Sequence, residues 1–160
     1  MAFEFTLDTP HFDINSIGKA DEHVATIDIG FDQNLGTTFK ILLALAPIAA
    51  LPPDHRELFF SLIESNPHEV VRNYRNGLET KNFLTGDERV SVLDAVACGA
   101  SYLVKKANPS VLVFNTLETN LPQKALAKYH RICAEVCKAG YQGGKVDSYH
   151  GSEQWHLVKV

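Results

Sequence analysis

Alternating apolar and polar residues mark the beginning of the chain as strand-forming. Every second residue from Phe3 to Leu7 is apolar, and a longer alternation, rich in β-branched residues, covers residues 22–31. A period of two residues places one face of each segment in a core. We therefore predict strands within the N-terminal part, residues 1–36, with a turn at residues 33–36.

The middle of the chain, residues 37–80, has apolar runs that fit helical spacing. A helix capped by Thr37 or Thr38 is expected to run toward Pro47, although a buried strand is the alternative for this wholly apolar run. Residues 52–63 indicate a second helix with an apolar stripe. Asn66-Pro67 has the form of an N-cap followed by proline, which begins a third helix. The pattern thus predicts a helical middle segment.

The clearest helix lies at residues 87–106. Thr85 to Glu88 fits a capping box, and apolar residues then recur at helical spacing for several turns until Asn108-Pro109. The short apolar run Val111–Phe114 follows, which is typical of a buried central strand.

A last helix and a hairpin complete the pattern. Thr119 or Asn120 is expected to cap a helix that has Pro122 in its first turn and ends at Gly140. Residues 145–150 and 153–160 then read as the two arms of a hairpin around Gly151-Ser152. We predict an α+β fold: a mixed, mostly antiparallel sheet flanked by helices, with the helical middle segment, in one domain over residues 1–160.

Composition narrows the function classes. The net charge is −4 and the pI is about 5.9, which disfavours a nucleic-acid partner that would be held through its phosphates. The N-terminus lacks the apolar region of a signal peptide, and the longest apolar run contains Pro47 and is too short for a bilayer. The three cysteines are odd in number, which indicates reduced thiols. We therefore expect a cytoplasmic protein without a membrane partner.

Few residues form a pattern typical of a chemical site. His150 and His156 are candidates to face each other across the hairpin, and His130, Cys133 and Cys137 share one helix face. A zinc site needs three or four convergent ligands, and neither CxxC nor HExxH is present, so we expect no metal. The polar residues that follow the apolar strand are the most interesting cluster, because ligand sites concentrate at this end of such strands. These residues are Asn115, Thr116 and Glu118.

The order of elements over residues 85–160 resembles the second half of the GNAT acetyltransferase superfamily, including small phage and prophage proteins of GNAT-like fold. In that family a strand is followed by a loop with an asparagine and by a helix of the pattern N-x(4)-A-x(2)-L-Y-x(3)-G-F/Y. Asn120, Ala125, Tyr129 and Gly140-Tyr141 are similar here, with a longer helix before the glycine.

The resemblance implies acetyl-CoA as cofactor, Tyr129 as the general acid that protonates the leaving thiolate, and Asn120 as a pantetheine-side contact. Asn115, at the end of the apolar strand, is a second candidate for cofactor binding. The family holds the pyrophosphate of acetyl-CoA in a glycine-rich turn, Q/R-x-x-G-x-G/A, at a helix N-terminus. The matching residues 83–88 have one glycine and two acids, which would repel a pyrophosphate by an amount on the order of 1 kcal/mol or more. The alternative, from the residues alone, is that Tyr129 is a core tyrosine on a buried helix face and has no catalytic role.

Three functions follow as hypotheses, and the sequence leaves catalysis open. The first is a GNAT-like domain without acetyl-CoA turnover and without a cofactor, which binds an unknown protein or associates with itself. The second is a divergent acetyl-CoA-dependent N-acyltransferase that uses Tyr129. The third is a small-ligand or metal-binding protein that uses the histidine-rich C-terminal hairpin.

Overall fold

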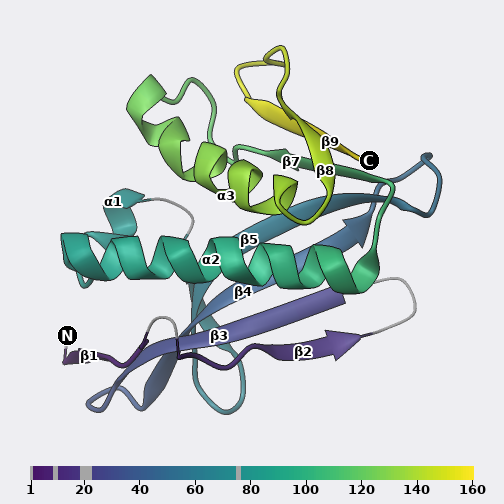
Figure 1. Cartoon of the computed structure of the whole chain (residues 1–160). Helices are drawn as coiled ribbons and strands as arrows, with labels where there is room; N and C mark the ends of the chain where they lie inside the picture. Colours follow the sequence, from purple (N-terminus) through teal and green to yellow (C-terminus); the bar gives the residue numbers. More distant parts are fainter. Residues whose placement is uncertain (1, 9–10, 19–22, 75–76) are drawn as a thin grey trace.

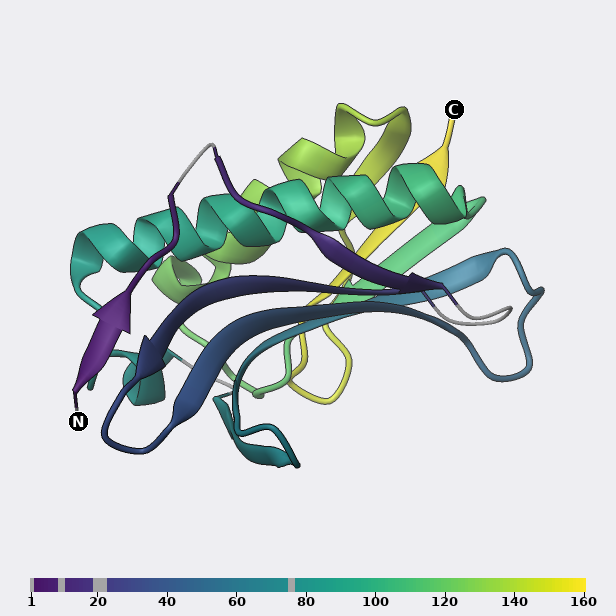
Figure 2. The ribbon, with the colours of Figure 1, turned by 90° about the horizontal axis from the view of Figure 1, so that it is seen from below.

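The computed structural model describes residues 2–8, 11–18, 23–74 and 77–160. In this part of the chain, nine strands form one mixed, mostly antiparallel sheet, and the two long helices lie together on one of its faces (Figures 1 and 2). The strand order is β1-β3-β4-β5-β7-β9-β8, with β2 beside β3 and β6 beside β5. The predicted α+β class, with a mostly antiparallel sheet and flanking helices, is confirmed.

The elements follow one another along the chain in the order strands, helix, strand, helix, hairpin. The first six strands are β1 (Phe3–Phe5), β2 (Asn15–Gly18), β3 (His23–Asp32), β4 (Thr37–Pro47), β5 (His55–Ser65) and β6 (Val70–Tyr74). The remaining elements are α1 (Gly77–Thr80), α2 (Gly86–Ala107), β7 (Val111–Asn115), the 3-10 turn η1 (Gln123–Leu126), α3 (Ala127–Cys137), β8 (Tyr141–Lys145) and β9 (Gln154–Lys159).

The N-terminal strands agree with the alternation in the sequence. β1 and β3 are present and pair with each other, and a turn joins β3 to β4 at residues 33–36. The buried carboxylate of Asp32 holds this turn, since its Oδ1 accepts hydrogen bonds from the amides of Asn34 and Leu35 at 2.9 and 3.2 Å. β2, which pairs with β3, was not predicted.

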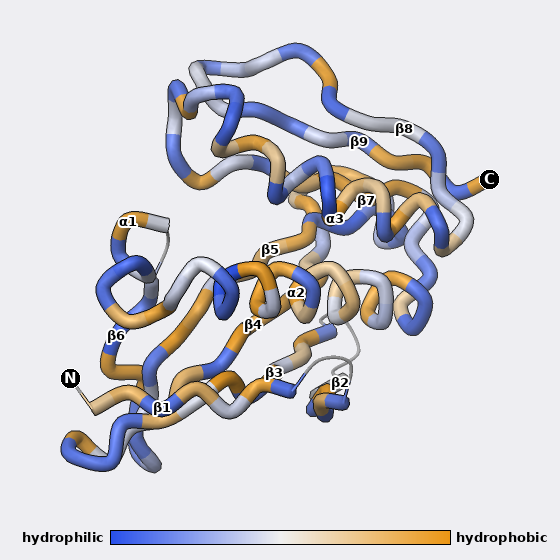
Figure 3. Tube along the Cα trace, turned by 60° about the vertical axis from the view of Figure 1, so that its left-hand side comes forward, coloured by the Kyte–Doolittle hydropathy of each residue, from blue (hydrophilic) through white to orange (hydrophobic). Residues whose placement is uncertain are grey.

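The prediction of a helical segment over residues 37–80 is wrong. Except for the single turn α1, the described residues of this segment form the strands β4, β5 and β6 and their connections. β4 alternates between buried and less buried positions from Thr37 to Leu45, as a strand does. The alternation is invisible in the sequence because Leu42 and Ala44, on the other face, are also apolar (Figure 3). The strand alternative for this run is the correct one.

Asn66-Pro67 begins a hairpin turn and not a helix. The side-chain oxygen of Asn66 accepts hydrogen bonds from the amides of His68 and Glu69 at 2.8 and 2.9 Å, and the Asn66 amide donates to the Glu69 carbonyl. Asparagine forms these bonds equally well at an N-cap and in an Asx-turn, so the same local chemistry fits both structures.

Helix α2 has the ends that the sequence predicts. Thr85 is its N-cap with a complete capping box, and Asn108 ends it in the left-handed conformation at φ 52°. The helix packs on β3 and β4. Gly99 allows this close approach, because a Cβ at this position would lie 2.8 Å from a methyl group of Leu43.

The last helix and the hairpin exist, with boundaries that differ from the prediction. Pro122, and neither Thr119 nor Asn120, precedes the first helical turn η1, which continues into α3. The hairpin is formed by β8 and β9, so its first arm begins at Tyr141 and residues 146–153 lie in the connection. None of the described helices has the length and apolarity required to cross a membrane.

One feature of the sheet positions the candidate site. β5 and β7 are its parallel pair, and they are in register only from His55–Glu57 to Val111–Val113. Beyond Glu57, β5 pairs with β6 on this side, whereas β7 continues beside β9 (Figure 1). The two strands therefore diverge, and side chains from β5, α2 and α3 line the space at the point of divergence.

Candidate functional site

Two adjoining pockets lie where β5 leaves β7. We call them the helix-side pocket, with a volume of about 280 Å³, and the open-face pocket, with a volume of about 390 Å³. The helix-side pocket includes residues of α2, whereas the open-face pocket includes Leu42 and Ala44 from the other face of β4. Phe60, Ser61 and Lys128 line both pockets, so the pockets meet at β5 beside the start of α3.

Tyr129 lines the open-face pocket from α3. Its side chain is 4% exposed, and its ring packs on Trp155 and Phe60 with centroids 5.1 and 5.7 Å away. Burial, and secondly the charge of Glu118, raises the pKa of Tyr129 to about 12. The hydroxyl therefore keeps its proton at neutral pH and can donate a hydrogen bond to a group in the pocket.

Asn115 reaches the same pocket from the end of β7. Its Nδ2 donates to Oε1 of Glu57 at 2.9 Å. Its Oδ1 is buried and has no hydrogen-bond partner among the described residues. A buried acceptor without a donor costs about 1–3 kcal/mol, so a ligand that donates a hydrogen bond here would remove this cost.

Asn120 does not join the other two candidate residues. It is exposed, adopts a positive φ of 55°, and donates its amide to the Gly151 carbonyl at 2.8 Å. It lies against the connection between β8 and β9 and lines neither pocket. The structure thus brings Tyr129 and Asn115 together in one pocket, and it places Asn120 elsewhere.

Lys128, which the sequence reasoning missed, occupies the junction of the two pockets. Its Nζ lies 5.1 Å from the centroid of the Tyr129 ring, within the range of a cation–π contact. Burial lowers the pKa of Lys128, and the charge of Glu118 opposes this shift. No sequence pattern points to this residue, because only folding places a lysine of α3 beside the middle of β5.

Arg89, also missed, lines the helix-side pocket from the first turns of α2. It stands three, four and seven residues before the pocket-lining Val92, Leu93 and Val96, so it lies on the apolar stripe of the helix. Its Nε is buried without a hydrogen-bond partner in the described part of the chain. The sequence could therefore have pointed to Arg89, because a charged residue on the apolar face of a helix is unusual.

The N-terminus of α2, where the family resemblance places a pyrophosphate, is engaged by the chain's own side chains. The Glu88 amide donates to Oγ1 of Thr85 at 3.2 Å, and the Thr85 amide donates to Oε2 of Glu88 at 2.8 Å. The Arg89 amide donates to the Thr85 carbonyl. The carboxylates of Asp87 and Glu88 complement the positive end of the helix dipole in this first turn.

The predicted histidine and cysteine groups do not assemble into a site. Among the described residues, no three histidine, cysteine or acidic side chains are placed to hold a metal ion. His156 lies opposite Gly144 across the hairpin, while His150 stands in the turn beyond, with a φ of 50°. Burial, followed by the neighbouring Cys137, raises the pKa of Cys133 to about 11, so this thiol is not a reactive nucleophile at neutral pH.

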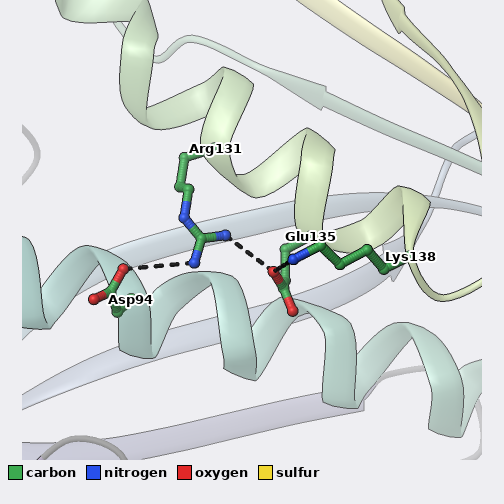
Figure 4. A network of polar contacts seen from close by, with 4 residues as sticks. All are labelled: Asp94, Arg131, Glu135 and Lys138. Atoms are coloured by element: carbon green, nitrogen blue, oxygen red, sulfur yellow. Dashed lines mark hydrogen bonds and ion pairs between the residues drawn. The ribbon is translucent and has the colours of Figure 1, made fainter.

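A chain of charged side chains fixes α3 against α2 (Figure 4). Arg131 of α3 lies 3.6 Å from Asp94 of α2 and 3.0 Å from Glu135, which also contacts Lys138 at 3.1 Å. Each exposed pair contributes at most about 1 kcal/mol. The network nevertheless joins the two helices that carry Arg89 and Lys128, so it helps to set the distance between the walls of the site.

Comparison of the chain with family models, with curated proteins and with solved structures gives no match in any of the three.

Proposed function

We propose that this chain is a GNAT-like domain that acts as a binding protein and does not turn over acetyl-CoA. The order of α2, β7, α3 and the β8–β9 hairpin supports the likeness, as it is the order on which the resemblance rests. The pockets at the divergence of β5 and β7 support a binding role, because they combine apolar walls with a few convergent polar groups.

The state of the α2 N-terminus is the observation that carries the proposal. A pyrophosphate would need free backbone amides and a close approach to the helix end. Here the capping box uses the amide of Glu88 and holds its carboxylate beside Thr85. Asp87 adds a second negative charge in the same turn. Each carboxylate would oppose a bound pyrophosphate by roughly 1 kcal/mol.

Calorimetric titration of the purified protein with acetyl-CoA, and with free CoA as a control, tests the proposal. We expect no saturable heat with either compound up to millimolar concentration. Saturable binding of acetyl-CoA in the micromolar range would overturn it. The variant Glu88→Gln, with Asp147→Asn in an exposed loop as its matched control, then shows whether the carboxylate at the helix end sets the affinity.

A divergent N-acyltransferase is the second candidate, and the convergence of Tyr129 and Asn115 in the open-face pocket favours it. In this case Tyr129 would protonate the leaving thiolate. Acetyl-CoA consumption in the presence of mixed amines would be abolished by Tyr129→Phe and kept by Tyr102→Phe, with circular dichroism confirming that both variants fold. Absence of turnover in the wild-type protein would exclude this candidate.

The cellular setting and the metal hypothesis remain proposals. We place the protein in the cytoplasm, with a second protein or a second copy of itself as its macromolecular partner. A metal-binding hairpin has no support from the described histidines, and metal analysis of the purified protein would detect one.

A further inference from the structure

The helix-side pocket has an apolar wall built from β4, β5, α2 and the segment between α1 and α2. β4 and β5 contribute one side, α2 contributes the other, and Gly77, Thr80 and Leu84 line the pocket from α1 and the residues after it. Its apolar lining residues are Ile41, Phe60, Leu62, Leu84, Val92, Leu93 and Val96. Tyr74 also lines the pocket, but its hydroxyl already donates to Oε2 of Glu64 at 2.9 Å. The wall therefore suits an apolar ligand body.

The charged residues that line this pocket are both cations, Arg89 and Lys128. This is unexpected in a chain with a net charge of −4. Neither residue forms an ion pair with a carboxylate of the described residues. Glu118 lowers the cost of the Lys128 charge from a distance, while the Nε of Arg89 is buried with no acceptor among the residues that the structure describes. The pocket thus holds positive charge that no described acidic side chain neutralises by an ion pair.

Arginine geometry indicates the kind of anion. A carboxylate binds side-on to a guanidinium by accepting one hydrogen bond from Nε and one from a terminal nitrogen. Within the described ranges of the chain, the Nε of Arg89 is the atom of this side chain that lacks a hydrogen-bond partner. A carboxylate at this position would satisfy it, and the apolar remainder of the molecule would extend along Val92, Leu93 and Val96.

We infer that the helix-side pocket binds a small carboxylate with an apolar body, such as a medium-chain fatty acid, with Arg89 as the carboxylate contact. The inference rests on the proposed function, in which the pocket serves for binding and not for an acetyl-CoA reaction. The volume of about 280 Å³ is at the lower end of ligand pockets, so a short chain fits and a long one does not.

Titration with octanoate, with octan-1-ol as the uncharged analogue, tests this assignment by calorimetry. We expect octanoate to bind at least about tenfold more tightly than octan-1-ol, because the carboxylate gains charge-assisted hydrogen bonds. Arg89→Met keeps an unbranched side chain and removes the guanidinium. It should weaken octanoate binding by about tenfold or more and leave octan-1-ol binding unchanged. Lys124→Met, an exposed lysine outside both pockets, serves as the matched control and should bind octanoate as the wild-type protein does.

Three results would overturn the inference: no octanoate binding by the folded wild-type protein, equal affinity for octanoate and octan-1-ol, or an Arg89→Met variant that folds and binds octanoate normally. Circular dichroism establishes folding for each variant. Acetyl-CoA is titrated in parallel, so the two proposals fail separately. Binding of acetyl-CoA contradicts the proposed function, whereas silence with both acetyl-CoA and octanoate contradicts only the assignment of the ligand.

Discussion

At the scale of single residues, buried polar groups are placed in matched sets. The carboxylate of Glu64, which is 5% exposed, accepts hydrogen bonds from Oγ1 of Thr37 at 2.8 Å and from the hydroxyl of Tyr74 at 2.9 Å. The three side chains belong to β4, β5 and β6, so they tie the short strand β6 to the sheet. Such a set is informative because the loss of one member leaves the others unsatisfied.

Tyr74→Phe should therefore lower the free energy of unfolding by about 1–3 kcal/mol, since Oε2 of Glu64 would lose its donor. Urea unfolding followed by circular dichroism measures the change. Tyr102→Phe is the control, because the hydroxyl of the exposed Tyr102 donates to Oγ of the half-buried Ser16 at 3.2 Å, and its removal should change stability by less than about 0.5 kcal/mol. Equal effects of the two substitutions would contradict the role given to Glu64.

Tyr129 makes the free energy of unfolding depend on pH in the alkaline range. Its pKa in the folded protein is about 12, against an ordinary value of 10.0. Between these values the unfolded chain releases the proton and the folded protein retains it. The free energy of unfolding should therefore fall as pH rises from 10 to 12, by up to about 1.4 kcal/mol per pH unit for this residue.

Urea unfolding at a series of pH values, with Tyr129→Phe beside the wild-type protein, measures this contribution. The variant should lose stability less steeply between pH 10 and 12, and the two slopes should agree between pH 7 and 9. Parallel curves over the whole range would show that the Tyr129 hydroxyl is not buried as described.

The site residues show what sequence reasoning can find at this scale. Asn115 was a candidate because it ends a buried strand, and Tyr129 was a candidate because it matches the family pattern; both line the open-face pocket. Arg89 is visible in the sequence as a cation on the apolar stripe of α2, next to the capping box. Lys128 could not be found, because its role depends on how α3 lies against β5.

At the scale of elements, prediction succeeded where local chemistry has one structural meaning. The capping box at Thr85 and the left-handed stop at Asn108 specify a helix, and both ends are confirmed. Prediction failed in β4 and β5, whose apolar residues occupy both faces. Phe59 is 43% exposed although its neighbour Leu58 is buried, so adjacent apolar residues lie on opposite faces of the strand. Leu62 and Ile63 follow four residues later, and the four residues together fit helical spacing. A strand with two apolar faces cannot be distinguished from a buried helix by periodicity alone.

The pair of adjacent glycines in β8 gives a test at this scale. Gly143 has a φ of 140°, and a Cβ there would lie 2.1 Å from the backbone oxygen of His156. Gly144 has no atom within 4 Å of its Cβ position. Gly143→Ala should therefore lower the free energy of unfolding by about 2 kcal/mol or more, through strain and displacement of β9.

Gly144→Ala is the matched control for this substitution, and it should leave stability within about 0.5 kcal/mol of the wild-type protein. Thermal and urea unfolding of both variants provide the comparison. If Gly143→Ala were as stable as Gly144→Ala, the register in which Gly143 faces Leu157 would be wrong.

At the scale of the whole molecule, the sequence predicted the fold class but not the arrangement that creates the site. The α+β class and the order of elements after residue 85 follow from local signals. The pockets depend on the divergence of β5 from β7, which pair over three residues only. The pairing register of strands far apart in the sequence cannot be read from local residue patterns. The divergence of β5 from β7 could also not be predicted because β5 was predicted as a helix.

Hydrogen exchange of the whole protein, with octanoate and with acetyl-CoA, tests the central claim most directly. The claim is that the helix-side pocket is the binding site of a GNAT-like domain that does not bind acetyl-CoA. We predict that octanoate slows amide exchange in residues 86–96 of α2 and residues 58–62 of β5, and that acetyl-CoA leaves exchange unchanged throughout. Slower exchange at residues 83–89 with acetyl-CoA, or protection by octanoate only outside the pocket, would contradict the claim.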